Sequence, residues 1–313
     1  MKKMASPEKK HNLSAVTGAG GFIGSHLVQM LLEEGHGVRA LVHYNALGSR
    51  GHLDEVLRCA SVADSTWLRE NRLEIVAGDI QDPRAMHALV RGTDVVFHLA
   101  ALIGIPYSYT SPQTYVNVNI CGTLNILEAC RDENVGLLVH TSTSETLGTA
   151  QYEPQDEKHP QRAQSPYAAT KIGADRLVES YHLSFSLPAV ILRPFNTYGP
   201  RQSARAVIPS ILAQALTHGR NEIQLGALDP VRDLTYVEDT ARAFVMVADA
   251  PREVVSGKLY HLGTGNGISI GDLARLSLRV LGIEKPVVED PNRIRPETSE
   301  VFRLISDNSL IRR

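Results

Sequence analysis

The chain has 313 residues, and its 32 Lys and Arg residues against 34 Asp and Glu give a formal net charge of -2. This balance gives no electrostatic reason for nucleic acid or a membrane surface to be a partner. No stretch reaches the roughly 18 apolar residues of a membrane span. Three cysteines without C-x-x-C spacing argue against a disulfide framework or a zinc site, so no metal is expected. We expect a cytoplasmic globular protein of one large domain or two lobes.

The first predicted strand, residues 13–17, leads into a glycine-rich turn, GAGGFIG at residues 18–24. A helical pattern of apolar residues follows and stops at Gly35. In this order of strand, turn and helix, small residues let the backbone approach a pyrophosphate, and the helix start offers N–H groups. The segment therefore predicts a dinucleotide site.

The second predicted strand, residues 38–42, ends without a carboxylate. An NAD site usually places Asp or Glu there to bind the ribose hydroxyls. The sequence therefore does not decide whether the cofactor is NAD or NADP. Arg39, His43 and Arg50 are candidates to meet a 2′-phosphate, although Arg50 is better explained as an ordinary loop residue.

Further strands are predicted at residues 73–80, 94–101 and 137–143, with helices at 83–90 and 115–131. The strand at 94–101 is almost wholly apolar, as a strand buried on both faces should be. Strands and helices that alternate with a period near 30 predict an α/β doubly wound parallel sheet. Catalytic groups should gather beyond the carboxyl ends of its strands.

The strand at 137–143 ends in such a group, Ser142-Thr143-Ser144-Glu145. Hydroxyls here suit hydrogen bonds to a sugar oxygen, and a carboxylate beside them suits proton transfer. Taken alone, loop caps and a solvated loop glutamate explain the same residues equally well.

The next signal is a tyrosine four residues before a lysine. Ser165-Pro166 predicts a helix start, so Tyr167 and Lys171 share one helical face. An ammonium beside a phenol favours the phenolate, so a group with an ordinary pKa of about 10 can move protons near neutral pH. Hydride chemistry at an alcohol needs such a base. Most pairs at this spacing are solvated surface pairs, and only the motifs before it favour catalysis.

These motifs together resemble the extended short-chain dehydrogenase/reductase family, whose members are NAD-dependent nucleotide-sugar epimerases, dehydratases and decarboxylases. The turn at 18–24, HLAA at 98–101, the Tyr167–Lys171 pair and RPFNTYGP at 193–200 carry the resemblance. It covers residues 13 to 307 approximately.

The resemblance implies a Rossmann domain over residues 1–195, with a return near 232–265. A smaller substrate-binding lobe would occupy mainly residues 196–313. The helices near 115–131 and 167–183 would pair across a homodimer, although their apolar stripes equally suit a monomer.

Within the family, TSE at residues 143–145 is similar to UDP-glucuronate decarboxylases and to UDP-N-acetylglucosamine 4,6-dehydratases of the legionaminic acid pathway. The runs at 100–109, 201–209 and 293–297 resemble that dehydratase. TLG at 146–148 departs from the usual Val-Tyr-Gly and is expected to reshape the floor of the site.

The resemblance implies oxidation, elimination of water and reduction within one sugar. Tyr167, its pKa lowered by Lys171, would take the proton of the 4-hydroxyl, and Thr143 would hydrogen-bond to the 4-oxygen. Glu145 would take the proton on carbon 5 before water leaves from carbon 6. Ser144 stands where relatives place an aspartic acid that protonates the leaving hydroxyl. Serine is a poor acid, so we expect Glu145 to serve both steps.

The resemblance also implies the binding residues. Those for the cofactor, NAD or NADP with NAD slightly preferred, are Gly18, Gly21, Phe22, Ile23, Gly24, His43, Asp79, Ile80, Leu99, Ala100, Ala101, Tyr167 and Lys171. Those for the UDP-sugar substrate are Asn196, Val207, Arg232 and Arg295. A guanidinium fork fits phosphate oxygens. Without the resemblance, an ion pair with Asp233 or Glu238 would explain Arg232, and simple solvation would explain Arg295.

Two other functions remain open. One is another enzyme of the same fold, a UDP-glucuronate decarboxylase or a nucleotide-sugar 4-epimerase. The other is a non-catalytic nucleotide-binding protein, against which the intact set of Thr143, Glu145, Tyr167 and Lys171 argues.

Overall fold

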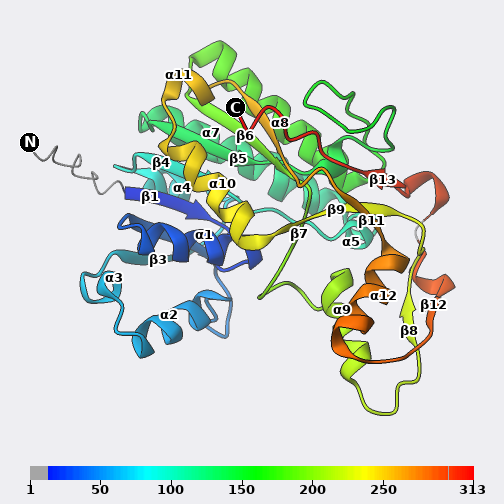
Figure 1. Cartoon of the computed structure of the whole chain (residues 1–313). Helices are drawn as coiled ribbons and strands as arrows, with labels where there is room; N and C mark the ends of the chain where they lie inside the picture. Colours follow the sequence, from blue (N-terminus) through cyan, green and yellow to red (C-terminus); the bar gives the residue numbers. More distant parts are fainter. Residues whose placement is uncertain (1–12, 295) are drawn as a thin grey trace, which may run out of the picture.

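A seven-stranded parallel sheet forms the centre of the molecule (Figure 1). The computed structural model describes residues 13–294 and 296–313. The strand order is β10-β6-β5-β4-β1-β2-β3, and every pair is parallel. The strands are β1 (Leu13–Thr17), β2 (Gly37–His43), β3 (Leu73–Gly78), β4 (Val95–His98), β5 (Leu137–Thr141), β6 (Ala189–Pro194) and β10 (Leu259–Leu262). The predicted doubly wound fold is confirmed.

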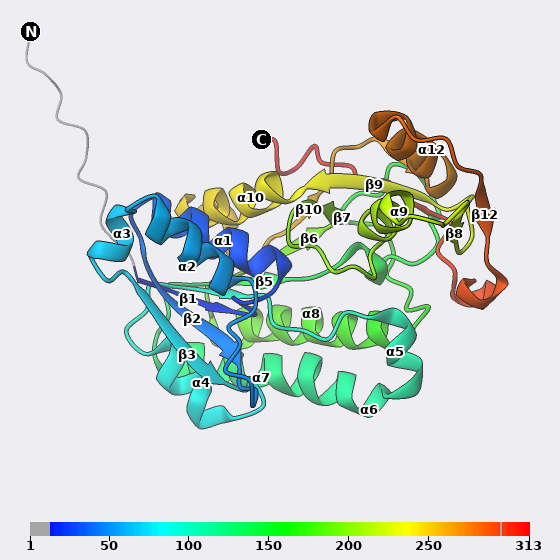
Figure 2. The same ribbon diagram turned by 90° about the horizontal axis from the view of Figure 1, so that it is seen from below.

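Helices cover both faces of this sheet, as the edge-on view of Figure 2 shows. One face carries α1 (Phe22–Glu33) and α10 (Val237–Asp249), with α2 (Leu53–Val62), α3 (Thr66–Arg69) and α11 (Arg252–Val255) nearby. The other carries α4 (Pro83–Val90), α7 (Gly122–Asp132) and α8 (Pro166–Phe185). Each face has its own buried apolar cluster, and these two clusters supply most of the core.

Three helix starts follow directly from local sequence. Asp82 accepts a hydrogen bond from the Arg84 N–H, and Ser165 accepts one from the Ala168 N–H. A proline follows each cap, where its missing N–H costs nothing. Ser269 caps α12 (Ile270–Leu281) by accepting a hydrogen bond from the Asp272 N–H. The cap at Ser165 sets the position of α8, which carries the predicted catalytic pair, Tyr167 and Lys171.

The connection from β4 to β5 is longer than one helix. It contains α5 (Ile105–Thr110), α6 (Pro112–Tyr115) and a π-helical segment, η1 (Val116–Cys121), before α7 begins. The predicted helix at 115–131 is therefore real, but its first turns are π-helical. In Figure 2, α7 and α8 lie side by side on the lower face of the sheet.

The second lobe is built on a smaller apolar cluster. It contains α9 (Val207–Leu216), α12, and the paired strands β8 (Ile223–Leu225) and β12 (Val287–Glu289). A second sheet joins the lobe to the main body, with β7 (Asn196–Tyr198), β9 (Val231–Tyr236), β11 (Gly267–Ser269) and β13 (Arg303–Leu304). Short turns of 3-10 helix lie at η2 (Ser144–Thr146), η3 (Pro291–Arg293) and η4 (Glu297–Ser299).

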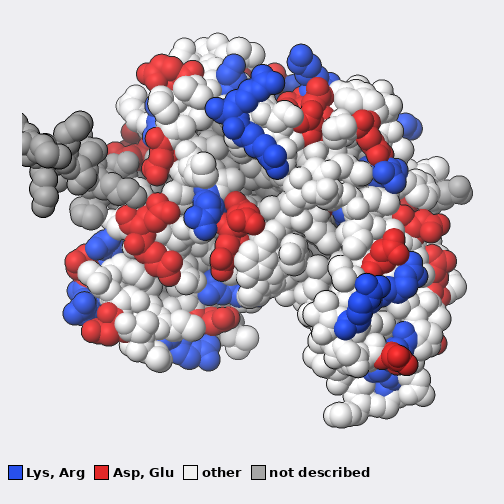
Figure 3. Space-filling model, in the orientation of Figure 1, with Lys and Arg blue, Asp and Glu red and all other residues white. Residues whose placement is uncertain are grey.

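Figure 3 shows a deep notch between the main body and this lobe, and acidic and basic side chains are mixed over the visible face. Within the described residues, no helix has the length and apolar character needed to cross a membrane.

Candidate active site

The first turns of α8 place the predicted catalytic pair beyond the end of β5. Tyr167 and Lys171 are 6% and 4% exposed. The Lys171 ammonium donates a hydrogen bond of 2.7 Å to the Thr141 carbonyl at the end of β5. The Tyr167 ring packs against Ile105 and Tyr115 in a small apolar cluster.

Burial has opposite effects on the two groups of this pair. It raises the pKa of Tyr167 above its ordinary value, an effect that the Thr143 hydroxyl opposes and the Glu145 charge increases. It lowers the pKa of Lys171 to about 8. The expected lowering of the Tyr167 pKa is therefore wrong for this structure. Loss of water around the phenol outweighs any attraction from the ammonium, which is turned toward the Thr141 carbonyl.

A buried charge network lies directly behind the pair, and the sequence analysis missed it. Asp175, one helical turn after Lys171, accepts hydrogen bonds from Arg193 (2.9 Å) and from the Ser142 hydroxyl (2.6 Å). His140 Nε2 lies 3.3 Å from its other oxygen. Burial alone would raise the pKa of Asp175, but His140 and Arg193 hold it well below its usual range. The only sequence signal for this network is the four-residue spacing from Lys171.

The hydroxyl and carboxylate group lies where the sequence predicts, beyond β5. Thr143 accepts a hydrogen bond of 3.3 Å from the Glu145 N–H and starts the 3-10 turn η2. Ser144 is 3% exposed, whereas Glu145 is half-buried. The turn η2 packs against α8, and the Glu145 charge raises the pKa of the Tyr167 phenol. The structure thus brings all five predicted catalytic residues together.

The TLG segment at residues 146–148, which differs from the usual Val-Tyr-Gly of the family, contacts the C-terminal segment. Leu147 is fully buried and clusters with Phe195, Val301 and Leu304. The Gln164 side chain, just before α8, donates to the carbonyls of Thr298 and Glu300. The C-terminal segment is therefore fixed against the loop that precedes the catalytic helix.

The glycine turn is tightly packed and suits a pyrophosphate. Gly18 has a φ of +69°, and a Cβ there would lie 2.8 Å from the Ala100 nitrogen. A Cβ on Gly24 would lie 2.2 Å from the Gly18 carbonyl oxygen. Gly21 caps α1 without any side-chain hydrogen bond, which leaves the N–H groups at the start of the helix available to an anion. These residues fit a dinucleotide.

Thr17 fixes the strand end beside this turn. Its hydroxyl accepts hydrogen bonds of 3.1 Å from the N–H groups of Leu99 and Ala100 and contacts His98 Nδ1 at 2.8 Å. The expected cofactor residues after β4 are thereby held against the expected residues after β1.

The end of β2 lies beside the end of β3. His43, which is exposed, has its Nδ1 3.9 Å from the Asp79 carboxylate. Ile80 is buried beneath Gly122. Arg50 pairs with Asp54 at 2.6 Å, as expected of an ordinary loop residue.

Arg39 is not available to a 2′-phosphate, so that expectation is wrong. Its guanidinium pairs with Glu74 at 2.7 Å and donates to the Leu89 and Arg91 carbonyls at the end of α4. These contacts lie on neighbouring elements of the sheet edge and hold the side chain away from the strand end.

The expected substrate residues lie at the start of the second lobe and on β9. Asn196 begins β7, and its buried side-chain oxygen has no hydrogen-bond partner within the part of the chain that the structure describes. Val207 is the first residue of α9. Arg232 is 7% exposed and pairs at 3.1 Å with Glu300, not with Asp233 or Glu238 as the simpler explanation supposed. Arg295 lies outside the described residues.

Comparison with known proteins identifies the family of the chain. The family model for GDP-mannose 4,6 dehydratase matches residues 15–313. The UDP-glucose 4-epimerase of Mycolicibacterium smegmatis is 33% identical over 301 residues, which cover 95% of this chain and 90% of the epimerase. The dTDP-glucose 4,6-dehydratase of Streptomyces antibioticus is 32% identical over 278 residues, 88% of this chain and 78% of that enzyme.

Solved structures agree with the fold. A dTDP-glucose 4,6-dehydratase from Streptomyces venezuelae with NAD bound superposes with a TM-score of 0.81 and 29% identity, covering 96% of this chain and 89% of that chain. A UDP-N-acetylglucosamine 4-epimerase from Methanobrevibacter ruminantium gives a TM-score of 0.81 and 28% identity, with coverage of 96% and 90%. The chain belongs to the NAD-dependent epimerase/dehydratase family of nucleotide-sugar enzymes, within the extended short-chain dehydrogenases/reductases.

Proposed function

We propose that the protein is a nucleotide-sugar 4,6-dehydratase, a lyase acting on UDP-N-acetylglucosamine. The observation that carries this proposal is the position of Glu145 on the turn η2, which packs against α8, the helix that carries Tyr167. A 4-epimerase needs one group to move the proton of the 4-hydroxyl. A 4,6-dehydratase needs a second base, for the proton on carbon 5.

In this proposal the glycine turn at residues 18–24 would hold a nicotinamide cofactor, which would supply hydride transfer from carbon 4 to carbon 6 of the sugar. Tyr167 takes the 4-hydroxyl proton, and Thr143 orients the 4-oxygen by a hydrogen bond. Glu145 then takes the proton from carbon 5, which the new 4-ketone has acidified. The same carboxyl delivers that proton to the hydroxyl leaving carbon 6. When hydride reaches carbon 6, carbon 5 takes up one proton from solvent and Tyr167 releases the proton it took, so the products balance as one water and one 4-keto-6-deoxy sugar.

Arg232 and Asn196 are proposed to bind the diphosphate. Arg232 offers a planar set of donors, and the unpaired Asn196 oxygen marks a polar group that awaits a ligand. Arg295 and Val207 are proposed to complete this subsite. Asp79, beside the end of β2, favours NAD because its carboxylate suits ribose hydroxyls and repels a 2′-phosphate.

A homodimer is also proposed. Helices α7 and α8 expose apolar side chains to solvent. On α7, Leu124 is 37% exposed, and on α8, Leu183 is 75% and Phe185 51% exposed. Apolar residues exposed on adjacent helices favour a partner surface. Sedimentation of the purified protein measures this directly.

The test of the function is incubation with UDP-N-acetylglucosamine and NAD, followed by mass spectrometry. We expect a product lighter by one water, lost in Glu145→Gln and retained in Ser144→Ala. An isomer of unchanged mass would instead establish a 4-epimerase, the second candidate, which the M. smegmatis and M. ruminantium relatives support. Carbon dioxide release from UDP-glucuronate would point to a decarboxylase.

A further inference from the structure

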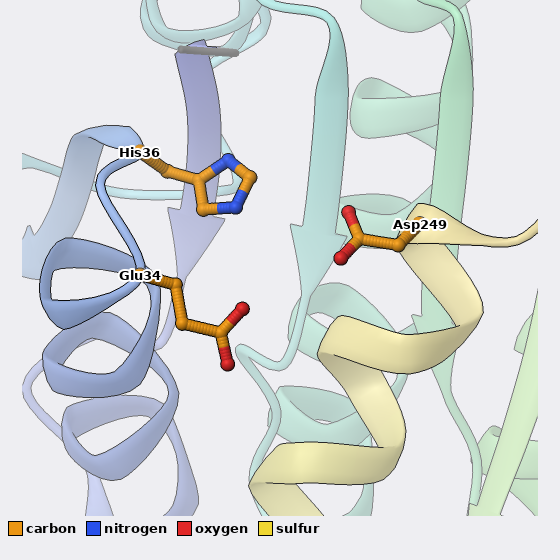
Figure 4. Close-up of side chains that lie close together, drawn as sticks. All are labelled: Glu34, His36 and Asp249. Atoms are coloured by element: carbon orange, nitrogen blue, oxygen red, sulfur yellow. The ribbon is translucent and has the colours of Figure 1, made fainter. Parts of the chain in front are cut away.

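A group of metal-ligand side chains lies at the far end of α1 from the glycine turn. Glu34, His36 and Asp249 place one ligand atom each within 4.8 Å of one another. Figure 4 shows the His36 ring and the Asp249 carboxylate facing each other from opposite elements, with the Glu34 carboxylate beside them. Helix α1 has 12 residues, so about 18 Å of helix separates this group from the dinucleotide turn.

The backbone holds two of these residues in fixed positions. Gly35 has a φ of +97°, and the His36 N–H donates to the Leu31 carbonyl at 2.9 Å. This is the hydrogen bond of a Schellman motif, which ends a helix with a glycine in the left-handed conformation. The turn therefore places the side chains on either side of Gly35 at the end of α1 without local flexibility.

His36 supplies the observation that points to a ligand. Its side chain is more than nine-tenths buried, with 8% exposure for the residue, and neither ring nitrogen has a hydrogen-bond partner among residues 13–294 and 296–313. A buried polar group without a partner costs about 1–3 kcal/mol. The ring faces the Asp249 carboxylate, so a cation placed between the two would satisfy one of its nitrogens.

The electrostatics of the helix ends favour a cation at the same point. Glu34 is the C-cap residue of α1, and Asp249 is the last residue of α10. A helix C-terminus carries a partial negative charge, so carboxylates there are unfavourable. Two carboxylates at two such ends concentrate negative potential beside the imidazole.

We propose that Glu34, His36 and Asp249 form a structural site for a divalent transition metal of the Zn²⁺ type. One imidazole nitrogen and two carboxylate oxygens, with water in the fourth position, suit Zn²⁺. Zinc bonds of about 2.0–2.1 Å place tetrahedral ligands about 3.4 Å apart. Metal binding would require the exposed Asp249 and half-buried Glu34 side chains to rotate from their present 4.8 Å limit to that spacing, while His36 is buried. The bound metal would join the C-terminal ends of α1 and α10.

The test uses the full chain, stripped of metal with a chelator and titrated with Zn²⁺ by calorimetry. We expect one Zn²⁺ per chain and a melting temperature that rises with Zn²⁺ but not with Mg²⁺. Mutation of a residue that only hydrogen-bonds to a metal ligand typically lowers the affinity for the metal about 10- to 100-fold. Asp249→Asn, at an exposed position, should therefore weaken Zn²⁺ binding at least about tenfold.

The matched control is Glu33→Gln. It makes the same change of charge one residue before Glu34, on an exposed side chain that accepts a hydrogen bond from Gln29. We expect unchanged Zn²⁺ affinity in this variant. Absence of binding up to about 0.1 mM Zn²⁺, or equal affinity in Asp249→Asn and the unchanged protein, would overturn the proposal. Neither result depends on the enzymatic reaction.

Discussion

The two walls of the candidate active site hold their charges differently. On the wall formed by β5, β6 and α8, Lys171, Asp175 and Arg193 are each less than 5% exposed, and Arg193 is bonded to Asp175. On the wall formed by β9 and the C-terminal segment, Arg232 pairs with Glu300, 68 positions away. The buried charges beside the proposed reaction site are thus paired within the protein core, whereas the arginine proposed to bind the nucleotide pairs with a carboxylate that a phosphate could replace.

The largest expected effect is a loss of turnover, and it comes from a change on α8. Tyr167→Phe keeps the ring that packs on Ile105 and Tyr115 but removes the group proposed to move a proton. We expect turnover to fall by about 10²- to 10⁴-fold, with an unchanged melting temperature. Turnover within tenfold of the unchanged enzyme would remove Tyr167 from the mechanism.

The second effect is on stability. Asp175→Asn leaves Arg193 buried with no charged partner, and breaking a buried pair costs about 3–5 kcal/mol. Urea unfolding measures the loss. Asp272→Asn is the control, because its pair with Arg275 on α12 is exposed and should contribute little. If both variants lost the same small amount of unfolding free energy, the buried network would not stabilise the fold.

The nucleotide-binding wall should show a smaller effect, confined to binding. Arg232→Ala is expected to weaken UDP binding about 10- to 100-fold, since hydrogen bonds to charged groups contribute about 1.5–3 kcal/mol. Glu300→Gln removes the competing carboxylate and should bind UDP at least as tightly as the unchanged protein. Calorimetric titration with UDP separates the two variants. Weaker binding in Glu300→Gln would mean that Glu300 positions Arg232 for the ligand.

The smallest effect concerns pH. Tyr167 must lose its proton to act as a base, and burial keeps its pKa above the neutral range, so turnover should rise with pH. Lys171 has a pKa of about 8 and supports the Tyr167 phenolate only in its charged form, so the rise should end as pH passes that value. The two titrations together predict turnover about eightfold higher at pH 8.5 than at pH 7.0 and constant above about pH 9. A rise of about tenfold per pH unit that continues above about pH 9 would contradict a role for the ammonium.

The sequence predicts well what depends on neighbouring residues. The glycine turn, the caps at Asp82 and Ser165, and the Tyr167–Lys171 face all rest on contacts within about one helical turn. Parallel strands then bring residues 143–145 to the same edge as Tyr167, so the candidate catalytic group is predictable once the fold class is known.

The remaining features depend on contacts distant in sequence. Nothing near Arg39 indicates that the end of α4 will accept its hydrogen bonds, and nothing near Arg232 indicates Glu300. Burial also reverses the expected effect on the pKa of Tyr167, because desolvation depends on the packing of α5 and α6. Such pairings become visible only when the chain is folded.

The most direct test of the proposed reaction is the fate of a deuterium label on carbon 4 of UDP-N-acetylglucosamine. We expect a product lighter by one water that carries the deuterium on carbon 6, seen by mass spectrometry and NMR. Deuterium that remains on carbon 4, in a sugar of unchanged mass and inverted configuration, would contradict the dehydratase and identify a 4-epimerase.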